Sequence, residues 1–172
     1  MLLSGHSRFE SVTGTAEATT LPRSSVDLIT AGQAFHGFDP APARKECARA
    51  LGPGGRVVLV WNDRRKHGAP FQEAYEKLLE TYATDYAEVE HGLMGRLENI
   101  RSFFAPNPVN TTTFGNRQVL DYKGLLGRLR SSSYVPAEGQ PGHSEILDEL
   151  ERIIRDHDNG GRIVMEYDTR AY

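Results

Sequence analysis

Two short apolar runs, separated by the length of one helix, constrain the fold of this chain most. The first extends from Val26 to Ala31 and the second from Val57 to Val60. Between them, Asp39 followed by Pro40 predicts a helix start, and Gly52-Pro53 predicts its end. The first run is apolar rather than alternating, which predicts a parallel strand buried on both faces. The pattern is typical of a βαβ unit, whose strands end at a ligand crevice.

The remainder of the chain predicts further strands and amphipathic helices. Strands are expected at Arg8 to Val12, at Val109 to Phe114 and at Arg162 to Tyr167. Helices are expected where apolar residues recur at helical spacing: Phe71, Tyr75, Leu78, Leu79 and Tyr82; Leu120 to Leu129; and Ile146, Leu147, Leu150, Ile153 and Ile154. Ser144 is the predicted N-cap of the last helix, and Asn159-Gly160-Gly161 is its predicted stop.

Composition excludes several classes of protein. The 172 residues are 38% hydrophobic, which predicts one globular domain over residues 1–172, and the βαβ pattern predicts that this is an α/β domain. The net charge of −3 and the absence of a long basic run argue against nucleic acid as a partner. No apolar stretch is long enough to cross a bilayer, so no membrane partner is expected. The single Cys47 fits a reducing, cytoplasmic setting, and no spacing of residues predicts a metal site.

Several segments of the sequence together resemble one enzyme family. They are Gly14-Thr15-Ala16-Glu17, Gly32-Gln33-Ala34-Phe35-His36, Trp61-Asn62, the region from Leu120 to Tyr134, and Tyr167-Asp168-Thr169-Arg170. As a set they are similar to class I S-adenosylmethionine-dependent methyltransferases, in the small-molecule branch that includes trans-aconitate methyltransferase. The resemblance extends from about Phe9 to Tyr172. It implies a Rossmann-like sheet flanked by helices.

The resemblance also implies roles for individual residues. Cofactor-binding residues would be Thr15, Ala16, Glu17, Gly32 and Gln33; substrate-binding residues would be His36, Trp61, Asn62 and Tyr134. His36 would assist a proton transfer, while methyl transfer to a small acceptor would depend on proximity and orientation. Some of these residues also have a simpler interpretation: residues 14–17 as a plain turn, His36 as a cap and Trp61 as core packing.

The family's Gly-rich turn and ribose-binding acidic residue are not found in this sequence. The resemblance therefore implies the C-terminal two-thirds of the fold, a truncated sheet without the first two strands and helices of the family. In the family's strand order, 3-2-1-4-5-7-6, this would leave the strand at Val26 to Ala31 with an open edge. We therefore expect weak binding of S-adenosylmethionine by the isolated chain, or none, and a homo-oligomer or a completing chain that covers the edge.

Two alternatives remain open at this stage. One is a serine hydrolase that uses Ser7 or Ser144, because Gly5-His6-Ser7 and Gly142-His143-Ser144 both begin like a nucleophile elbow. Phe9 and Ile146 replace the second glycine of that motif. The other is a non-catalytic binding fragment. The methyltransferase interpretation itself includes a chain that is inactive or that depends on a partner or an oligomer.

Overall fold

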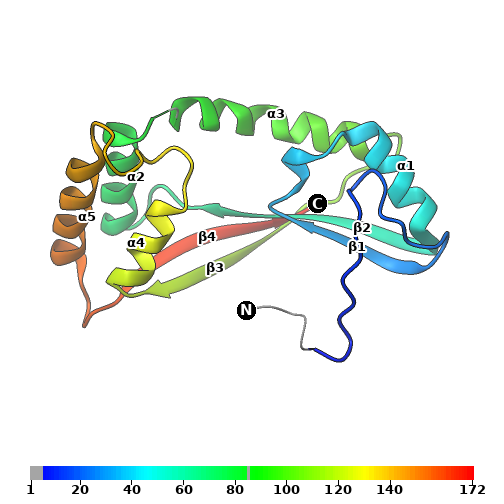
Figure 1. Cartoon of the computed structure of the whole chain (residues 1–172), viewed down its shortest axis with the longest axis horizontal. Coiled ribbons are helices and arrows are strands. Elements are labelled where there is room, and N and C mark those ends of the chain that lie inside the picture. Colours follow the sequence, from blue (N-terminus) through cyan, green and yellow to red (C-terminus); the bar gives the residue numbers. More distant parts are fainter. Residues whose placement is uncertain (1–5, 85) are drawn as a thin grey trace. The chain divides into compact units, whose positions relative to one another are not determined.

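The structure is a computed structural model that describes residues 6–84 and 86–172. Its elements, labelled in Figure 1, are β1 (Val26–Gly32), the 3-10 helix η2 (Phe35–Gly37), α1 (Pro40–Ala50), β2 (Leu51–Arg64), α2 (Pro70–Tyr82), α3 (Tyr86–Phe104), β3 (Thr112–Leu120), α4 (Tyr122–Arg130), α5 (His143–His157) and β4 (Ile163–Ala171). Four strands and their helices make a mixed α/β fold, as the sequence predicts. No helix in the described residues is both long and apolar enough to span a membrane.

The strand order confirms the expected sheet. The strands are hydrogen-bonded in the order β1-β2-β4-β3, which corresponds to the 4-5-7-6 part of the family order. β1 pairs with β2 in parallel, with Leu28 opposite Arg56 and Gly32 opposite Val60. Since α1 connects these two strands, the predicted βαβ unit is present. β1 is at one edge of the sheet.

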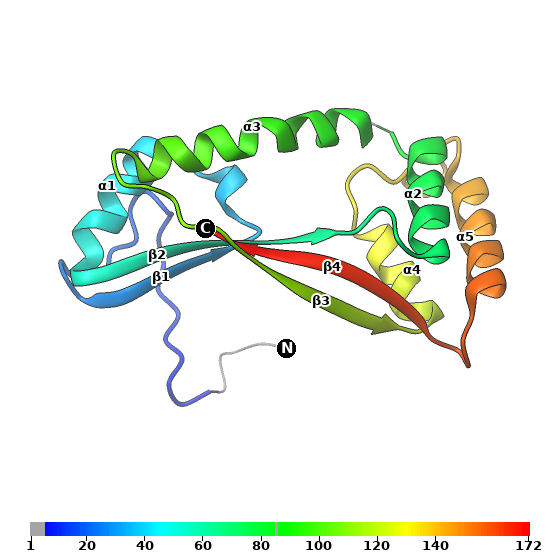
Figure 2. The ribbon, with the colours of Figure 1, turned by 180° about the vertical axis from the view of Figure 1, so that it is seen from behind.

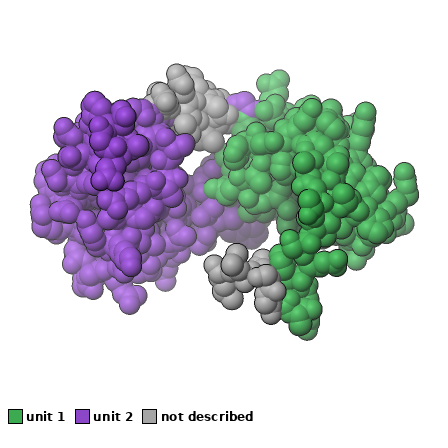
Figure 3. All heavy atoms as spheres, in the orientation of Figure 1, with its two compact units in different colours: residues 1–61, 96–112, 171–172 green, residues 62–95, 113–170 purple. Residues whose placement is uncertain are grey.

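The chain divides into two compact units, which Figure 3 colours separately. Unit 1 contains residues 1–61, 96–112 and 171–172, and unit 2 contains residues 62–95 and 113–170. The units are not successive segments, because β2, α3 and β4 each begin in one unit and end in the other.

Unit 1 is built around β1, β2 and α1. In both Figure 1 and Figure 2, α1 lies on one side of these strands. Its buried core consists of Ala31, Phe35, Ala43, Leu59, Trp61, Ile100, Phe103 and Tyr172. The last residue of the chain is part of this core: Tyr172 exchanges two backbone hydrogen bonds with Leu59, and its ring packs edge-on against Trp61 at 5.8 Å between centroids.

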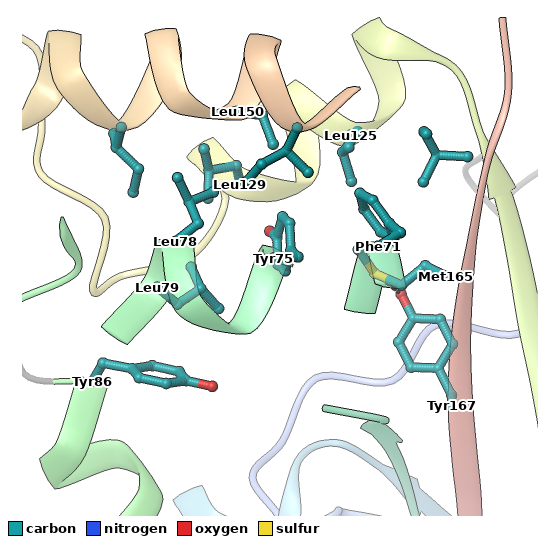
Figure 4. Close-up of a cluster of buried hydrophobic side chains, with 13 residues drawn as sticks. Phe71, Tyr75, Leu78, Leu79, Tyr86, Leu125, Leu129, Leu150, Met165 and Tyr167 are labelled. Carbon is teal, nitrogen blue, oxygen red and sulfur yellow. Dashed lines mark hydrogen bonds between the residues drawn. The ribbon is translucent and has the colours of Figure 1, made fainter. Parts of the chain in front are cut away.

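Unit 2 has a larger apolar core, drawn in Figure 4. Side chains of α2, α4, α5 and β4 form it, among them Tyr75, Leu78, Leu129, Leu150 and Tyr167. The amphipathic spacing in α2 and α5 predicted these helices, and their apolar faces meet in this core.

A buried carboxylate lies at the boundary of this core. Glu76, 4% exposed, accepts hydrogen bonds from the Tyr86 hydroxyl at 2.9 Å and from the guanidinium of Arg64. The Lys66 ammonium lies 3.0 Å from the same carboxylate. Burial alone would raise the pKa of Glu76, but the hydrogen bonds from Arg64 and Lys66 outweigh it and lower the pKa.

Several predictions about local structure are wrong. Arg8 to Val12 forms no strand, because no neighbouring strand in the described structure pairs with it. β1 is not buried on both faces: Leu28 is 56% exposed at this edge strand. The third strand begins at Thr112, after the predicted start at Val109, and extends beyond Phe114 to Leu120. Gly142, with a left-handed φ of 85°, is the N-cap of α5, so Ser144 lies within the helix instead.

Candidate functional site

The carboxyl end of β1 is the place where the sequence predicts a ligand crevice. Gln33 follows the strand with a left-handed φ of 56°, and its amide donates a hydrogen bond of 2.9 Å to the carbonyl of Val60 in β2. The chain therefore turns away from the sheet directly after Gly32. A Cβ atom added to Gly32 would meet nothing within 4 Å, so the space beside this strand end is open. Parallel α/β sheets bind ligands at strand ends of this kind.

The loop after Gln33 is anchored by one aromatic residue. Phe35 is 3% exposed, and its ring packs edge-on against Phe103 at 5.0 Å and Trp61 at 6.2 Å between centroids. His36, the next residue, is exposed in η2. Burial of Phe35 therefore fixes the loop, while the His36 imidazole faces solvent. An exposed imidazole in a fixed loop is available for proton transfer or for contact with a ligand.

A tight turn lies in the same unit. Thr15 and Ala18 exchange two backbone hydrogen bonds of 3.1 Å. Gly14 is required beside this turn, because a Cβ atom there would lie 2.6 Å from the carbonyl oxygen of Ala18. Ala16 packs against the core of unit 1 that contains Phe35. The turn is thus fixed to the same core as the loop after β1, and the exposed Thr15 hydroxyl can bind a ligand.

Glu17 joins the turn to helix α1. Its Oε1 accepts a hydrogen bond of 3.0 Å from the backbone amide of Asp39, the N-cap of α1. This hydrogen bond is the main cause that lowers the pKa of Glu17. Asp39 is the N-cap of α1, which agrees with the predicted helix start, but its side chain makes no capping hydrogen bond. Glu17 positions two segments of the candidate site.

A second carboxylate, which sequence reasoning missed, fixes the segment after the turn. Glu46 of α1 accepts hydrogen bonds from the amide and hydroxyl of Thr19, at 2.8 and 2.5 Å, and from Arg49. Arg49 also donates to the carbonyl of Leu21 at 2.6 Å. Hydrogen bonds from Arg49 and then Thr19 lower the pKa of Glu46 to about 2. No local pattern in the sequence predicted this role of Glu46, because its contacts join residues far apart in the sequence.

The other predicted substrate residues have different surroundings. Trp61 is 5% exposed and belongs to the core of unit 1, with the guanidinium of Arg96 5.1 Å above its ring. Asn62 and Tyr134 belong to unit 2. There Asn62 accepts a hydrogen bond from the Thr169 hydroxyl at 2.8 Å, and the Tyr134 ring packs against Tyr86. The candidate site described here therefore consists of residues of unit 1.

The serines of the hydrolase alternative are both exposed. Ser7 lies in a turn near the start of the described chain, and Ser144 lies in the first turn of α5. The ring of the neighbouring His143 is 2.7 Å from the carbonyl of Pro136. Within residues 6–84 and 86–172, no hydrogen bond joins either serine to an imidazole, and no cluster of three metal-binding side chains is present.

Comparison with known proteins identifies the fold. Residues 3–59, less than half of the chain, match the family model described as a methyltransferase domain. A structure from Anaeromyxobacter dehalogenans, provisionally identified as a type II methyltransferase, superposes with a TM-score of 0.64 at 24% identity, over 96% of this chain and 72% of that one. The fold is that of methyltransferases. The matched residues 3–59 include the turn at Thr15 and the crevice after β1.

Two groups of relatives extend this similarity. An uncharacterised methyltransferase of Schizosaccharomyces pombe is 30% identical over 166 residues, which cover 92% of this chain and 62% of that protein. One of Mycobacterium tuberculosis is 55% identical over 51 residues, which cover 30% of this chain and 21% of that protein. The chain therefore spans less than two thirds of the length of these relatives.

Proposed function

We propose that this chain belongs to the S-adenosylmethionine-dependent methyltransferases and transfers a methyl group to a small-molecule acceptor. The observation that carries the proposal is the coincidence of two findings. The residues that match the methyltransferase family, 3–59, include the turn at Thr15 and the end of β1, where the space beside Gly32 is open. A family match at a place with the geometry of a binding site supports a ligand role more strongly than either finding alone.

The residues present fit the cofactor chemically. The exposed Thr15 hydroxyl can accept a hydrogen bond from an amine, and the open space at Gly32 admits a ligand close to the backbone. Gln33 offers an amide side chain at the same strand end. When bound, S-adenosylmethionine supplies an electrophilic methyl group. The exposed His36 is then our candidate for accepting a proton from the acceptor.

Glu17 contributes by position. Because its Oε1 already accepts the Asp39 amide, we assign it the task of holding the turn at Thr15 beside the start of α1. Ala16 has a similar task through its packing against the core. Trp61 supports the loop through Phe35, whereas Asn62 and Tyr134 stay substrate-binding candidates on the resemblance alone.

Calorimetric titration of the purified chain with S-adenosylmethionine tests the proposal. We expect binding in the micromolar range or weaker, because the 172 residues contain neither the family's Gly-rich turn nor its ribose-binding acidic residue. Gln33→Asn, which shortens the side chain but tolerates the left-handed backbone, should weaken binding several-fold. Gln140→Asn, in an exposed loop, is the matched control. No heat of binding at millimolar cofactor would contradict the proposal.

The partner of the chain is part of the same proposal. β1 is an edge strand, and Leu28 on it is 56% exposed, so an unpaired edge lies beside an apolar side chain. We propose that a second copy or a completing chain covers this edge. Sedimentation of the chain at high concentration should detect a dimer or larger species that Leu28→Lys weakens. A monomer at every concentration would argue against the second copy.

A further inference from the structure

A hollow on the surface of unit 1 lies outside the crevice described above. Its volume is about 530 Å³, and it lies between α1 and the last turn of α3. This volume is in the range of small-molecule sites. Phe103, 4% exposed, forms part of its apolar lining together with Pro40, Ala41 and Ala48.

The shape of the hollow follows from the residues of α1. Ala41 and Ala48 are two turns apart on the helix, on the face that also carries Arg44 and Lys45. Methyl side chains at these two positions leave space where longer ones would fill it. The hollow is thus apolar at its centre and polar where Arg44, Lys45 and Ser102 border it.

The two cations at this border differ from four arginines of the described residues that pair with carboxylates. Arg49, Arg64, Arg65 and Arg170 all pair with carboxylates. Within the described residues, Arg44 and Lys45 make no ion pair, although both are exposed beside the hollow. Asp39 also lines it, so the three charged groups sum to a formal charge of +1 in a chain whose net charge is −3.

Of the amides at the start of the helix, only that of Ala41 has no acceptor within the described residues. Pro40 and Pro42 lack an amide hydrogen, and the amide of Ala43 already donates to the carbonyl of Asp39. An anion in the hollow would therefore be held by the side chains of Arg44 and Lys45. A guanidinium and an ammonium side by side favour a carboxylate or phosphate group.

We propose that this hollow is a second binding site, for a small organic anion with an apolar body. The anionic group contacts Arg44 and Lys45, and the apolar body packs on Phe103 between the two alanines. The proposal rests on the hollow and its charges, and it does not depend on the methyltransferase function. It is also separate from the crevice, since none of Thr15, Gln33 and His36 lines the hollow.

Backbone NMR titration with phenylacetate tests this site directly. We expect amide shifts that saturate and are concentrated at residues 39–48 and 102–103. The neutral phenylacetamide has nearly the same shape, so its affinity should be about tenfold lower if a charged hydrogen bond contributes about 1.5 kcal/mol. Added salt should weaken phenylacetate much more than phenylacetamide, because the cations are exposed.

Variants separate charge from shape. Arg44→Gln and Lys45→Gln should each lower phenylacetate affinity about two- to fivefold, and Ala48→Phe should abolish binding by filling the hollow with both cations intact. Arg56→Gln, an exposed arginine on β2 of the same unit, is the matched control and should leave affinity unchanged.

Three results would overturn the proposal: shifts spread outside the hollow, equal affinity for the acid and the amide, or full binding by Ala48→Phe. All three variants replace exposed side chains, so folding can be checked from the undisturbed remainder of each spectrum.

Discussion

The carboxylates of unit 1 bind backbone amides of loops, whereas the central carboxylate of unit 2 binds side chains. In unit 1, Glu17 and Glu46 accept backbone amides of loops, those of Asp39 and Thr19, and so attach the turn at Thr15 to helix α1. In unit 2, Glu76 accepts side-chain donors from the end of β2 and the start of α3. The first arrangement fixes the backbone around a candidate site, whereas the second neutralises charges beside a core.

This difference predicts how each unit responds to the loss of its carboxylates. Loss of Glu76 leaves Arg64 and Lys66 without their carboxylate, and Arg64 is largely buried. Loss of Glu17 or Glu46 leaves loop amides that water can still reach. We therefore expect unit 2 to respond in stability, and unit 1 to respond in the position and pH dependence of its loops.

The largest effect is expected for Glu76→Gln. The substitution keeps the size of the side chain but leaves the Arg64 guanidinium uncompensated, which costs about 3–5 kcal/mol when one partner of a buried pair is lost. Urea unfolding measures this change. Glu80→Gln, exposed on the same helix, is the control and should change stability by less than about 0.5 kcal/mol. Equal stability of the two variants would show that the cluster is not a stabilising unit.

A smaller loss is expected when the turn of unit 1 is overpacked. Gly14→Ala places a Cβ atom 2.6 Å from the carbonyl oxygen of Ala18, so the backbone must shift. Overpacking of this kind costs about 1–3 kcal/mol. Gly37→Ala is the control, because a Cβ atom there meets nothing within 4 Å. If both glycine variants unfold at the same urea concentration, the turn is not tight in solution.

The next effect depends on pH. Because the pKa of Glu46 is lowered from 4.5 to about 2, its contribution to stability is full above pH 4.5 and is lost as the pH falls towards 2. Wild type should therefore lose stability over this interval more steeply than Glu46→Gln. Urea unfolding at several pH values compares the two, with Glu145→Gln on the exposed side of α5 as control. Parallel curves for wild type and Glu46→Gln would contradict the assignment.

Local sequence signals correctly predicted those helices and strands that depend on residues close together in the chain. Asp39 and Pro40 marked the start of α1, and the two apolar runs predicted β1 and β2. The strand order followed from the resemblance to methyltransferases. The amphipathic face of α2 was visible as spacing alone.

The failures share one physical cause, which is dependence on distant partners. Arg8 to Val12 has strand composition but no strand beside it, and β1 is exposed because of its edge position. The roles of Glu17 and Glu46 depend on contacts with residues more than 20 positions away. Nothing in a local pattern distinguishes such a carboxylate from one that faces solvent. The place of Trp61 in a core agrees with its simpler interpretation as core packing, whereas the place of Asn62 in the other unit could not be predicted for the same reason.

The smallest effect on stability, and the sharpest test of the site, is expected for His36→Ala. Its neighbour Phe35 is buried among aromatic rings, so Phe35→Ala should cost about 3–5 kcal/mol. His36 is exposed, and its replacement should change stability by less than about 0.5 kcal/mol. With methyl-labelled S-adenosylmethionine and a panel of small acceptors, however, transfer per folded molecule should fall about 100-fold if the imidazole accepts the proton.

Phe35 would then be needed for folding, and the adjacent His36 for methyl transfer. The comparison is sharpened by His36→Gln, which keeps hydrogen bonding but cannot accept a proton at neutral pH. If His36→Gln retains full transfer while His36→Ala loses it, the residue binds the acceptor and does not take its proton. If both retain full transfer, His36 has no part in the reaction. Gln33 and the turn at Thr15 are then the remaining candidates for contact with a ligand beside Gly32.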